Sequence, residues 1–118
     1  MNFLFVLNES PYGGERSYNA LRLARELTMD TAADNAARIF LIGDAVSCAK
    51  GGQKVPQGFY SIEAMLHGLS AHGAEVGVCG SCMDARGLTD AELGTDCKRG
   101  SMAQLATWTT WAEKVIVF

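Results

Sequence analysis

Residues 3–7 read FLFVL, an unbroken run of apolar side chains close to the start of the chain. Such a run is typical of a β-strand that is buried on both faces, as in a parallel sheet with helices on either side. The loop predicted next, over residues 8–14, holds one proline and two glycines. A helix is predicted over residues 15–29, because leucine and alanine recur there at helical spacing.

The alternation of strand and helix continues to the end of the chain. Further strands are predicted over residues 36–42, 74–78, 94–97 and 114–118. Helices are predicted over residues 61–72 and 101–112, and shorter helical turns over 45–50, 82–86 and 89–93. This order indicates an α/β fold in one domain spanning residues 1–118. We expect a three-layer α/β/α sandwich with a mostly parallel sheet of about five strands.

Charge and hydropathy exclude several classes of partner. The chain of 118 residues has 10 Lys and Arg against 13 Asp and Glu, a net charge of −3, and no basic run exceeds two residues. A nucleic-acid partner is therefore not expected. No stretch approaches the roughly 18 apolar residues that a membrane span requires. The N-terminal run lacks the positive start and cleavage site of a signal peptide, so we expect a cytoplasmic protein without a membrane partner.

Four cysteines are the most informative residues for chemistry. They are Cys48, Cys79, Cys82 and Cys97. In a reducing cytosol they are expected to be thiols. Cys79 and Cys82 form a C-x-x-C motif between a predicted strand and a helical turn, where free N–H groups would lower a thiol pKa. Arg86 adds positive charge nearby. We interpret Cys79 and Cys82 as catalytic, against the alternative that both are small buried hydrophobes.

A dithiol redox role is an alternative interpretation, because C-x-x-C near a βαβ pattern suggests thioredoxin-like chemistry. Thioredoxin-like proteins carry the motif after an early strand and face it with a proline from later in the chain. Here the motif follows the third predicted strand, and both prolines, Pro11 and Pro56, precede it. The order of motif and prolines argues against this alternative.

A zinc site is a second alternative. Structural zinc prefers four ligands with paired C-x-x-C spacing. This chain has one such pair, so the fold would have to bring in Cys48 and Cys97, or else His67 and His72. We expect no metal and no other cofactor. The two lone cysteines are predicted to lie in the core and the two histidines at the surface.

Loops that follow parallel strands lie at one edge of the sheet, where ligands gather in open α/β folds. We therefore predict that Asn8 and Tyr12 line a pocket beside Cys79, together with Asp44 and Arg86. Capping a helix is the alternative role for Asp44. The loop after the first strand lacks both the lysine of a P-loop and G-x-G-x-x-G spacing, so a nucleotide site is not predicted.

The motifs taken in order resemble those of the DsrE/DsrF-like family, especially its YchN-like branch. The longer ones are FLIGDAV at 40–46, YSIEAML at 60–66 and VCGSCMDARG at 78–87. Asn8, PYG at 11–13, GQK at 52–54 and the segments 100–108 and 114–118 complete the resemblance, which covers essentially the whole chain.

This resemblance implies a homo-oligomer, commonly a trimer or hexamer, and a link to intracellular sulfur handling. In sulfur-relay relatives, a cysteine after the equivalent strand accepts sulfur as a persulfide, and that role falls on Cys79, with Cys82 as an accessory. The expected function is a persulfide carrier or sulfurtransferase that works with donor and acceptor proteins. The alternative is a non-enzymatic binding or scaffold protein with structural cysteines.

Overall fold

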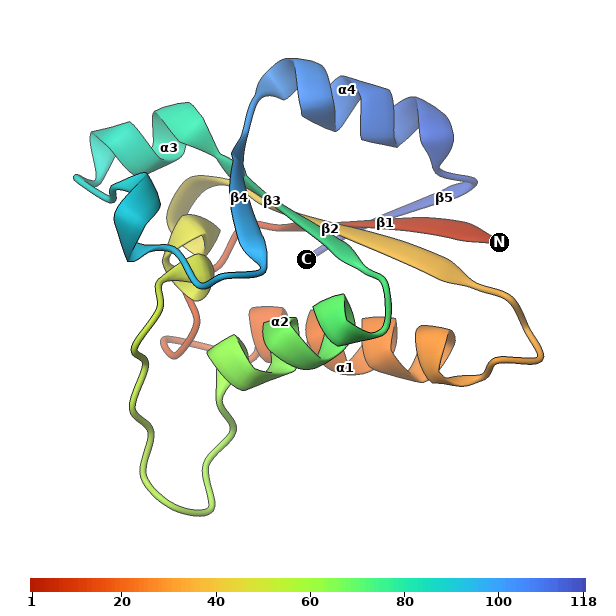
Figure 1. Cartoon of the computed structure of the whole chain (residues 1–118), viewed down its shortest axis with the longest axis horizontal. Coiled ribbons are helices and arrows are strands. Elements are labelled where there is room, and N and C mark those ends of the chain that lie inside the picture. Colours follow the sequence, from red (N-terminus) through yellow and green to blue (C-terminus); the bar gives the residue numbers. More distant parts are fainter.

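The computed structural model describes all residues from 1 to 118 and contains one parallel sheet of five strands in the order β4-β3-β2-β1-β5. The strands are β1 (Asn2–Leu7), β2 (Ala36–Leu41), β3 (Glu75–Cys79), β4 (Cys97–Gly100) and β5 (Lys114–Val117). Helices α1 (Arg16–Met29) and α2 (Ile62–Ala71) cover one face, and α4 (Met102–Trp111) covers the other (Figure 1). The predicted three-layer sandwich is confirmed.

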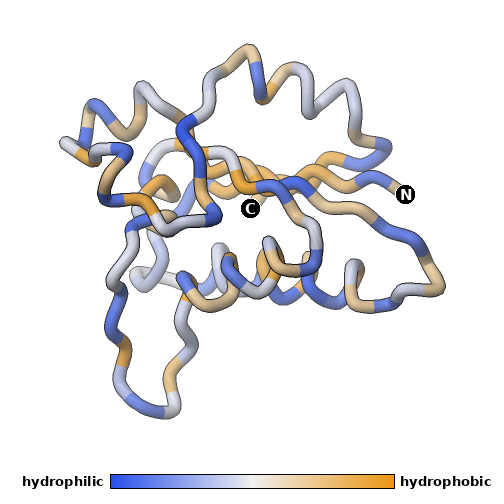
Figure 2. The backbone as a smooth tube through the Cα atoms, viewed as in Figure 1, coloured by the Kyte–Doolittle hydropathy of each residue, from blue (hydrophilic) through white to orange (hydrophobic).

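The core lies on both faces of the three central strands. Apolar residues concentrate in these strands, whereas the helices alternate between polar and apolar positions (Figure 2). The side chains of Phe5, Phe40 and Leu41 are fully buried, as are Leu4 and Leu7. Both faces of β1 are covered because α1 packs on one side and α4 on the other, which explains the unbroken apolar run at the start of the chain.

Helix α4 approaches the sheet closely through Trp108. Its indole packs edge-on against the ring of Phe40, with 6.1 Å between ring centroids, and is almost fully buried. The second tryptophan, Trp111, is half-buried, and the guanidinium of Arg38 lies 4.1 Å from its ring centroid. Trp108 is therefore a core residue.

Several elements begin one to three residues away from the predicted positions, and two of these differences concern the segments around the C-x-x-C motif and β4. The helical turn expected from Cys82 is a six-residue helix, α3 (Gly80–Ala85), so that Cys79 immediately precedes its first residue. The strand expected over residues 94–97 is β4, which begins at Cys97, because the residues before it form a turn closed by the hydrogen bond from Cys97 N to Gly94 O. The other two short turns are the 3₁₀ segments η1 (Gly43–Ala49) and η2 (Asp90–Glu92).

No helix in the structure combines the length and the apolar character that crossing a membrane would require.

Gly77, in the middle of β3, permits the close contact between the sheet and α4. A Cβ atom there would lie 2.8 Å from Gln104 Oε1 and 3.1 Å from both Phe40 Cδ2 and Trp108 Cη2. We expect Gly77→Val to lower the free energy of unfolding by about 1–3 kcal/mol through overpacking. Urea denaturation measures this. Gly68→Ala is the matched control, because a Cβ there meets nothing within 4 Å, and it should stabilise the helix slightly. Equal midpoints for Gly77→Val and wild type would contradict the packing account.

Candidate functional site: a dithiol at the carboxyl edge of the sheet

Cys79 is the last residue of β3 and therefore lies at the carboxyl edge of the sheet. Parallel pairing sets Val78 beside Leu41 of β2 and Cys79 beside Gly100 of β4. The segments that follow β2 and β3 therefore leave the sheet at the same level. Because α3 starts directly after Cys79, Cys82 falls in the first turn of this helix and returns toward β2.

Gly43 makes the contact between the two segments. Its backbone N–H donates a hydrogen bond to Cys82 Sγ over 3.3 Å. Its φ angle is +60°, a conformation that glycine adopts without steric cost. A β-carbon at this position would also sit 3.9 Å from the carbonyl oxygen of Asn8, so the loop after β1 borders the same place. The edge of the sheet thus brings the first three strand-end loops together, as predicted.

The two thiols differ in their electrostatics. Burial alone raises the pKa of Cys79, but the thiol of Cys82, the hydroxyl of Ser81 and nearby backbone N–H groups together lower it below the ordinary thiol value. The distance from Cys79 Sγ to Ser81 Oγ is 3.4 Å. The pKa of Cys82 is raised, by burial first and then by its hydrogen bond to Cys79. Cys79 therefore loses its proton before Cys82 does and is the better nucleophile of the two.

The solvent exposure of the two thiols is the reverse of what their pKa values would suggest. Cys79 is only 5% exposed, whereas Cys82 is half-buried. The more nucleophilic sulfur thus lies deeper than its neighbour.

Arg86 and Asp44, both predicted to line a pocket, form an ion pair. Nε and Nη2 of Arg86 donate to Asp44 Oδ1 over 3.0 and 2.8 Å, and Nη1 donates to the carbonyl oxygen of Cys82 over 3.1 Å. The ion pair links the C-terminal end of α3 to η1. The positive charge of Arg86 acts on the pKa of Cys82, which it lowers, but less than burial raises it.

Asn8 and Tyr12, the other two predicted pocket residues, have structural hydrogen bonds. Asn8 donates from Nδ2 to the carbonyl oxygen of Phe118 over 3.1 Å. The hydroxyl of Tyr12 donates to Gln53 Oε1 and accepts from the backbone N–H of Ile62, so it anchors the start of α2. The structure therefore brings Asp44 and Arg86 to the dithiol, Asn8 to its border and Tyr12 to the adjoining helix.

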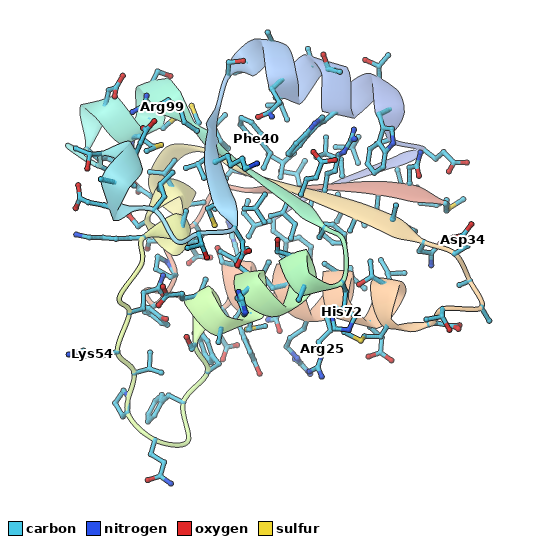
Figure 3. The ribbon with its side chains drawn as sticks, viewed as in Figure 1. Arg25, Asp34, Phe40, Lys54, His72 and Arg99 are labelled. Carbon is cyan, nitrogen blue, oxygen red and sulfur yellow. The ribbon has the colours of Figure 1, made fainter.

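Arg99 of β4 was not identified from the sequence, yet it holds α3 in place. It donates to the carbonyl oxygen of Gly80 over 3.1 Å and pairs with Asp84 and Asp90 over 3.0 and 2.6 Å. Figure 3 shows Arg99 beside this helix. An isolated six-residue helix is unstable in water, so these contacts help to fix the turn that carries both cysteines. In the sequence Arg99 lies beyond the strand predicted over residues 94–97, so no local pattern singled it out.

The lone cysteines lie apart from this dithiol. Cys48 and Cys97 are buried, and burial raises their pKa values to about 11 and about 12. They border a cavity of about 320 Å³ together with His67, whose Nδ1 lies 2.5 Å from Asp96 Oδ2. No three His, Cys, Asp or Glu side chains come together in a group able to hold a metal ion. His67 and His72 are exposed, as expected.

The fold and site define a parallel α/β domain with a polarised dithiol at the end of its third strand. The chain belongs to the DsrE/DsrF-like family, whose sequence model matches residues 1–118. It is 38% identical to YchN of Escherichia coli over 115 residues, which cover 98% of this chain and 97% of YchN. It is also 35% identical to an uncharacterized protein of Methanopyrus kandleri, MK0008, over 96% of this chain and 90% of that protein.

Solved structures agree with this assignment. The crystal structure of YchN from E. coli superposes with a TM-score of 0.91, covering 99% of this chain and 98% of that one. A protein of unknown function from Methanobacterium thermoautotrophicum, MTH1491, has a TM-score of 0.81 over 99% of this chain and 98% of its own. At 13% identity the second likeness shows the fold alone. Membership in the DsrE/DsrF-like family points to a function related to sulfur relay.

The difference in pKa predicts how the cysteines label. Alkylation by iodoacetamide follows the thiolate fraction, so Cys79 should reach its half-maximal rate below pH 9, the ordinary value for a thiol. Cys48 and Cys97 should require pH values near 11 and 12 in the folded protein. Peptide mass spectrometry after timed labelling resolves each site.

Ser81→Ala should move the Cys79 midpoint to higher pH, because the hydroxyl favours the thiolate. Ser47→Ala, an exposed change outside the site, is the control. A Cys79 midpoint above that of Cys82 would show that the assignment of the two thiols is reversed.

Proposed function

We propose that this protein is a persulfide carrier of the sulfurtransferase type, with Cys79 as the residue that holds the sulfur. The observation that carries the proposal is the lowered pKa of Cys79, at the end of β3, in a chain of the DsrE/DsrF-like family. A thiolate at neutral pH is the form that attacks a sulfur donor.

The transfer needs no change in total oxidation state. The Cys79 thiolate attacks the outer sulfur of a donor persulfide, forming a new S–S bond while the donor's S–S bond breaks. The donor leaves as a thiolate, and the outer sulfur keeps its proton on Cys79. An acceptor thiolate then attacks that outer sulfur and releases Cys79 as a thiolate.

Cys82 has two roles consistent with its place in the first turn of α3. As the protonated partner it donates a hydrogen bond that favours the Cys79 thiolate. It is also the nearest thiol able to attack Cys79 Sγ in the persulfide, which would form a Cys79–Cys82 disulfide and release hydrosulfide. That side reaction ends the carrier cycle until a reductant restores the dithiol.

The alternative function is a non-enzymatic scaffold whose cysteines are structural. The buried positions and raised pKa values of Cys48 and Cys97 fit such a role. Cys79 is buried too, but its lowered pKa does not fit, because a structural thiol gains nothing from a pKa below its ordinary value. The carrier function is therefore preferred.

Intact mass after incubation with a persulfide donor tests the carrier function. Wild type is expected to gain one sulfur atom, which dithiothreitol removes. Cys79→Ser should gain none, whereas Cys48→Ser, a control in the core, should load like wild type if it folds. Cys82→Ser should load and hold the sulfur longer, because the attack that releases hydrosulfide is lost. Loading of Cys79→Ser at the wild-type level would overturn the assignment.

We also propose that the chain assembles with copies of itself through β5. This strand lies at the edge of the sheet with a single neighbour, β1. Val115 and Val117 are 44% and 65% exposed on it. An uncovered apolar edge strand is a template for association. The trimer or hexamer implied by the family would cover this edge.

Light scattering coupled to size exclusion tests the assembly. Wild type should be oligomeric, and Val117→Lys should lower its mass by placing a charge in the covered edge. Leu23→Lys, a similar change on the outer surface of α1, should leave the mass unaltered. A monomeric wild type, or unaltered assembly in Val117→Lys, would rule out β5 as the contact.

A further inference from the structure

A groove runs between α1 and α2 on the outer face of the molecule, on the layer opposite α4. It has a volume of about 500 Å³. Its lining on α2 runs from Ser61 to His72, a length of about 16 Å at 1.5 Å per residue. The volume lies within the range of sites for small molecules. Neither Cys79 nor Cys82 borders it.

The formally charged side chains that line the groove are both arginines. Arg22, Arg25 and His72 line it, and no Asp or Glu does, although the chain as a whole has a net charge of −3. Arg25 and His72 extend from the two helices toward the same region, near the C-terminal end of α2 (Figure 3). The adjacent carboxylate on α1, Glu26, is not part of the lining.

The two arginines also differ from the others in the chain. Arg16, Arg38, Arg86 and Arg99 each pair with a carboxylate. Arg22 instead donates to the amide oxygen of Asn19 and lies 5.3 Å from the ring centroid of Tyr18, and Arg25 makes no ion pair or side-chain hydrogen bond. The two guanidinium groups without a carboxylate partner are thus both in this groove.

The floor and one end of the groove are apolar. Leu21 and Leu69 form buried parts of the floor, and Met65 is half-buried beside them. At the end near Ser61, Tyr18 and Tyr60 stack with their centroids 3.9 Å apart and an angle of 16° between the ring planes. The groove therefore offers aromatic and aliphatic surface near Ser61, with Arg22 over the Tyr18 ring, and Arg25 with His72 toward the other end.

Gly68 keeps the middle of the groove open. It lines the groove on α2, and a Cβ added to it would meet no atom within 4 Å. His72 is oriented by the hydrogen bond between its Nδ1 and the carbonyl oxygen of Gly68, at 2.8 Å, which leaves Nε2 available to a ligand. A side chain at position 68 would enter the groove without disturbing the packing of α2 on the sheet.

We propose that this groove binds a small organic anion that has an apolar body and one carboxylate or sulfonate head. The body would lie over the apolar floor at Met65, and the head would pair with Arg22, which lies over the Tyr18 ring, and with Arg25. Planar guanidinium groups suit such oxyanions because they donate two parallel hydrogen bonds. The volume suits a small molecule better than a folded partner, which would need a far larger contact area. The site is independent of the dithiol and of the carrier function.

Anilinonaphthalene sulfonate, an aromatic anion whose fluorescence rises in apolar sites, is the probe. Titration of the folded protein should reveal one site per chain, occupied equally in Cys79→Ser. The double variant Arg22→Gln, Arg25→Gln should weaken binding about tenfold, because charged hydrogen bonds are lost. Arg16→Gln, on the same helix but outside the lining of the groove, is the matched control and should bind like wild type.

Two further measurements distinguish the contribution of the ligand's anionic head to binding from that of its apolar body. Neutral phenylnaphthylamine, which lacks the sulfonate, should bind the double arginine variant as it binds wild type. Gly68→Phe should weaken both probes by filling the groove, and circular dichroism verifies that each variant is folded. Unchanged sulfonate binding in the double variant, or unchanged binding of both probes in Gly68→Phe, would overturn the proposal. Loss of oligomeric mass in Gly68→Phe would instead assign the groove to a second copy of the chain and also overturn it.

Discussion

Parallel pairing of β2, β3 and β4 puts the ends of the three strands at one level, and the arrangement of the dithiol depends on it. With Leu41 beside Val78 and Cys79 beside Gly100, the chain after β2 emerges next to the chain after β3. Only this alignment lets the N–H of Gly43 reach Cys82 Sγ, 39 residues away in sequence. A shift of one residue would reverse the facing of every side chain in the strand and would break this contact.

Much of the architecture could be predicted from the sequence because its signals are local. The run FLFVL fits a strand covered on both faces, and Ser61 and Ser101 each cap the helix expected after them. The start of β4 could not be predicted in this way. The residues before Cys97 form a turn held by contacts with distant chain, including Gly94 N to Ala49 O, and spacing along the sequence does not encode such contacts.

The candidate site, like the fold, has features that the sequence reveals and features that it does not. The C-x-x-C motif after a strand, visible in the sequence, locates the two thiols. The direction of their polarisation depends on the folded geometry. The thiol of Cys82 and the hydroxyl of Ser81 lower the pKa of Cys79, whereas burial raises that of Cys82 by more than Gly43 and Arg86 lower it. Arg99 holds α3 through Gly80 and Asp84, which lie 19 and 15 positions before it in the sequence. Their pairing follows from the crossover between β3 and β4, which no local pattern reveals.

The depth of Cys79 has a consequence for the sulfur that it is proposed to carry. An S–S bond is about 2 Å long, so a persulfide on this buried sulfur would hold its terminal atom about 2 Å beyond Sγ, with the S–S linkage itself inside the protein. The linkage to the protein would stay shielded from bulky oxidants. A small thiolate that approaches end-on would reach the terminal sulfur before it could reach the S–S linkage. The depth of Cys79 alone would then favour transfer of the sulfur to an acceptor thiolate over its loss to a bulky oxidant, without a lid or a moving loop.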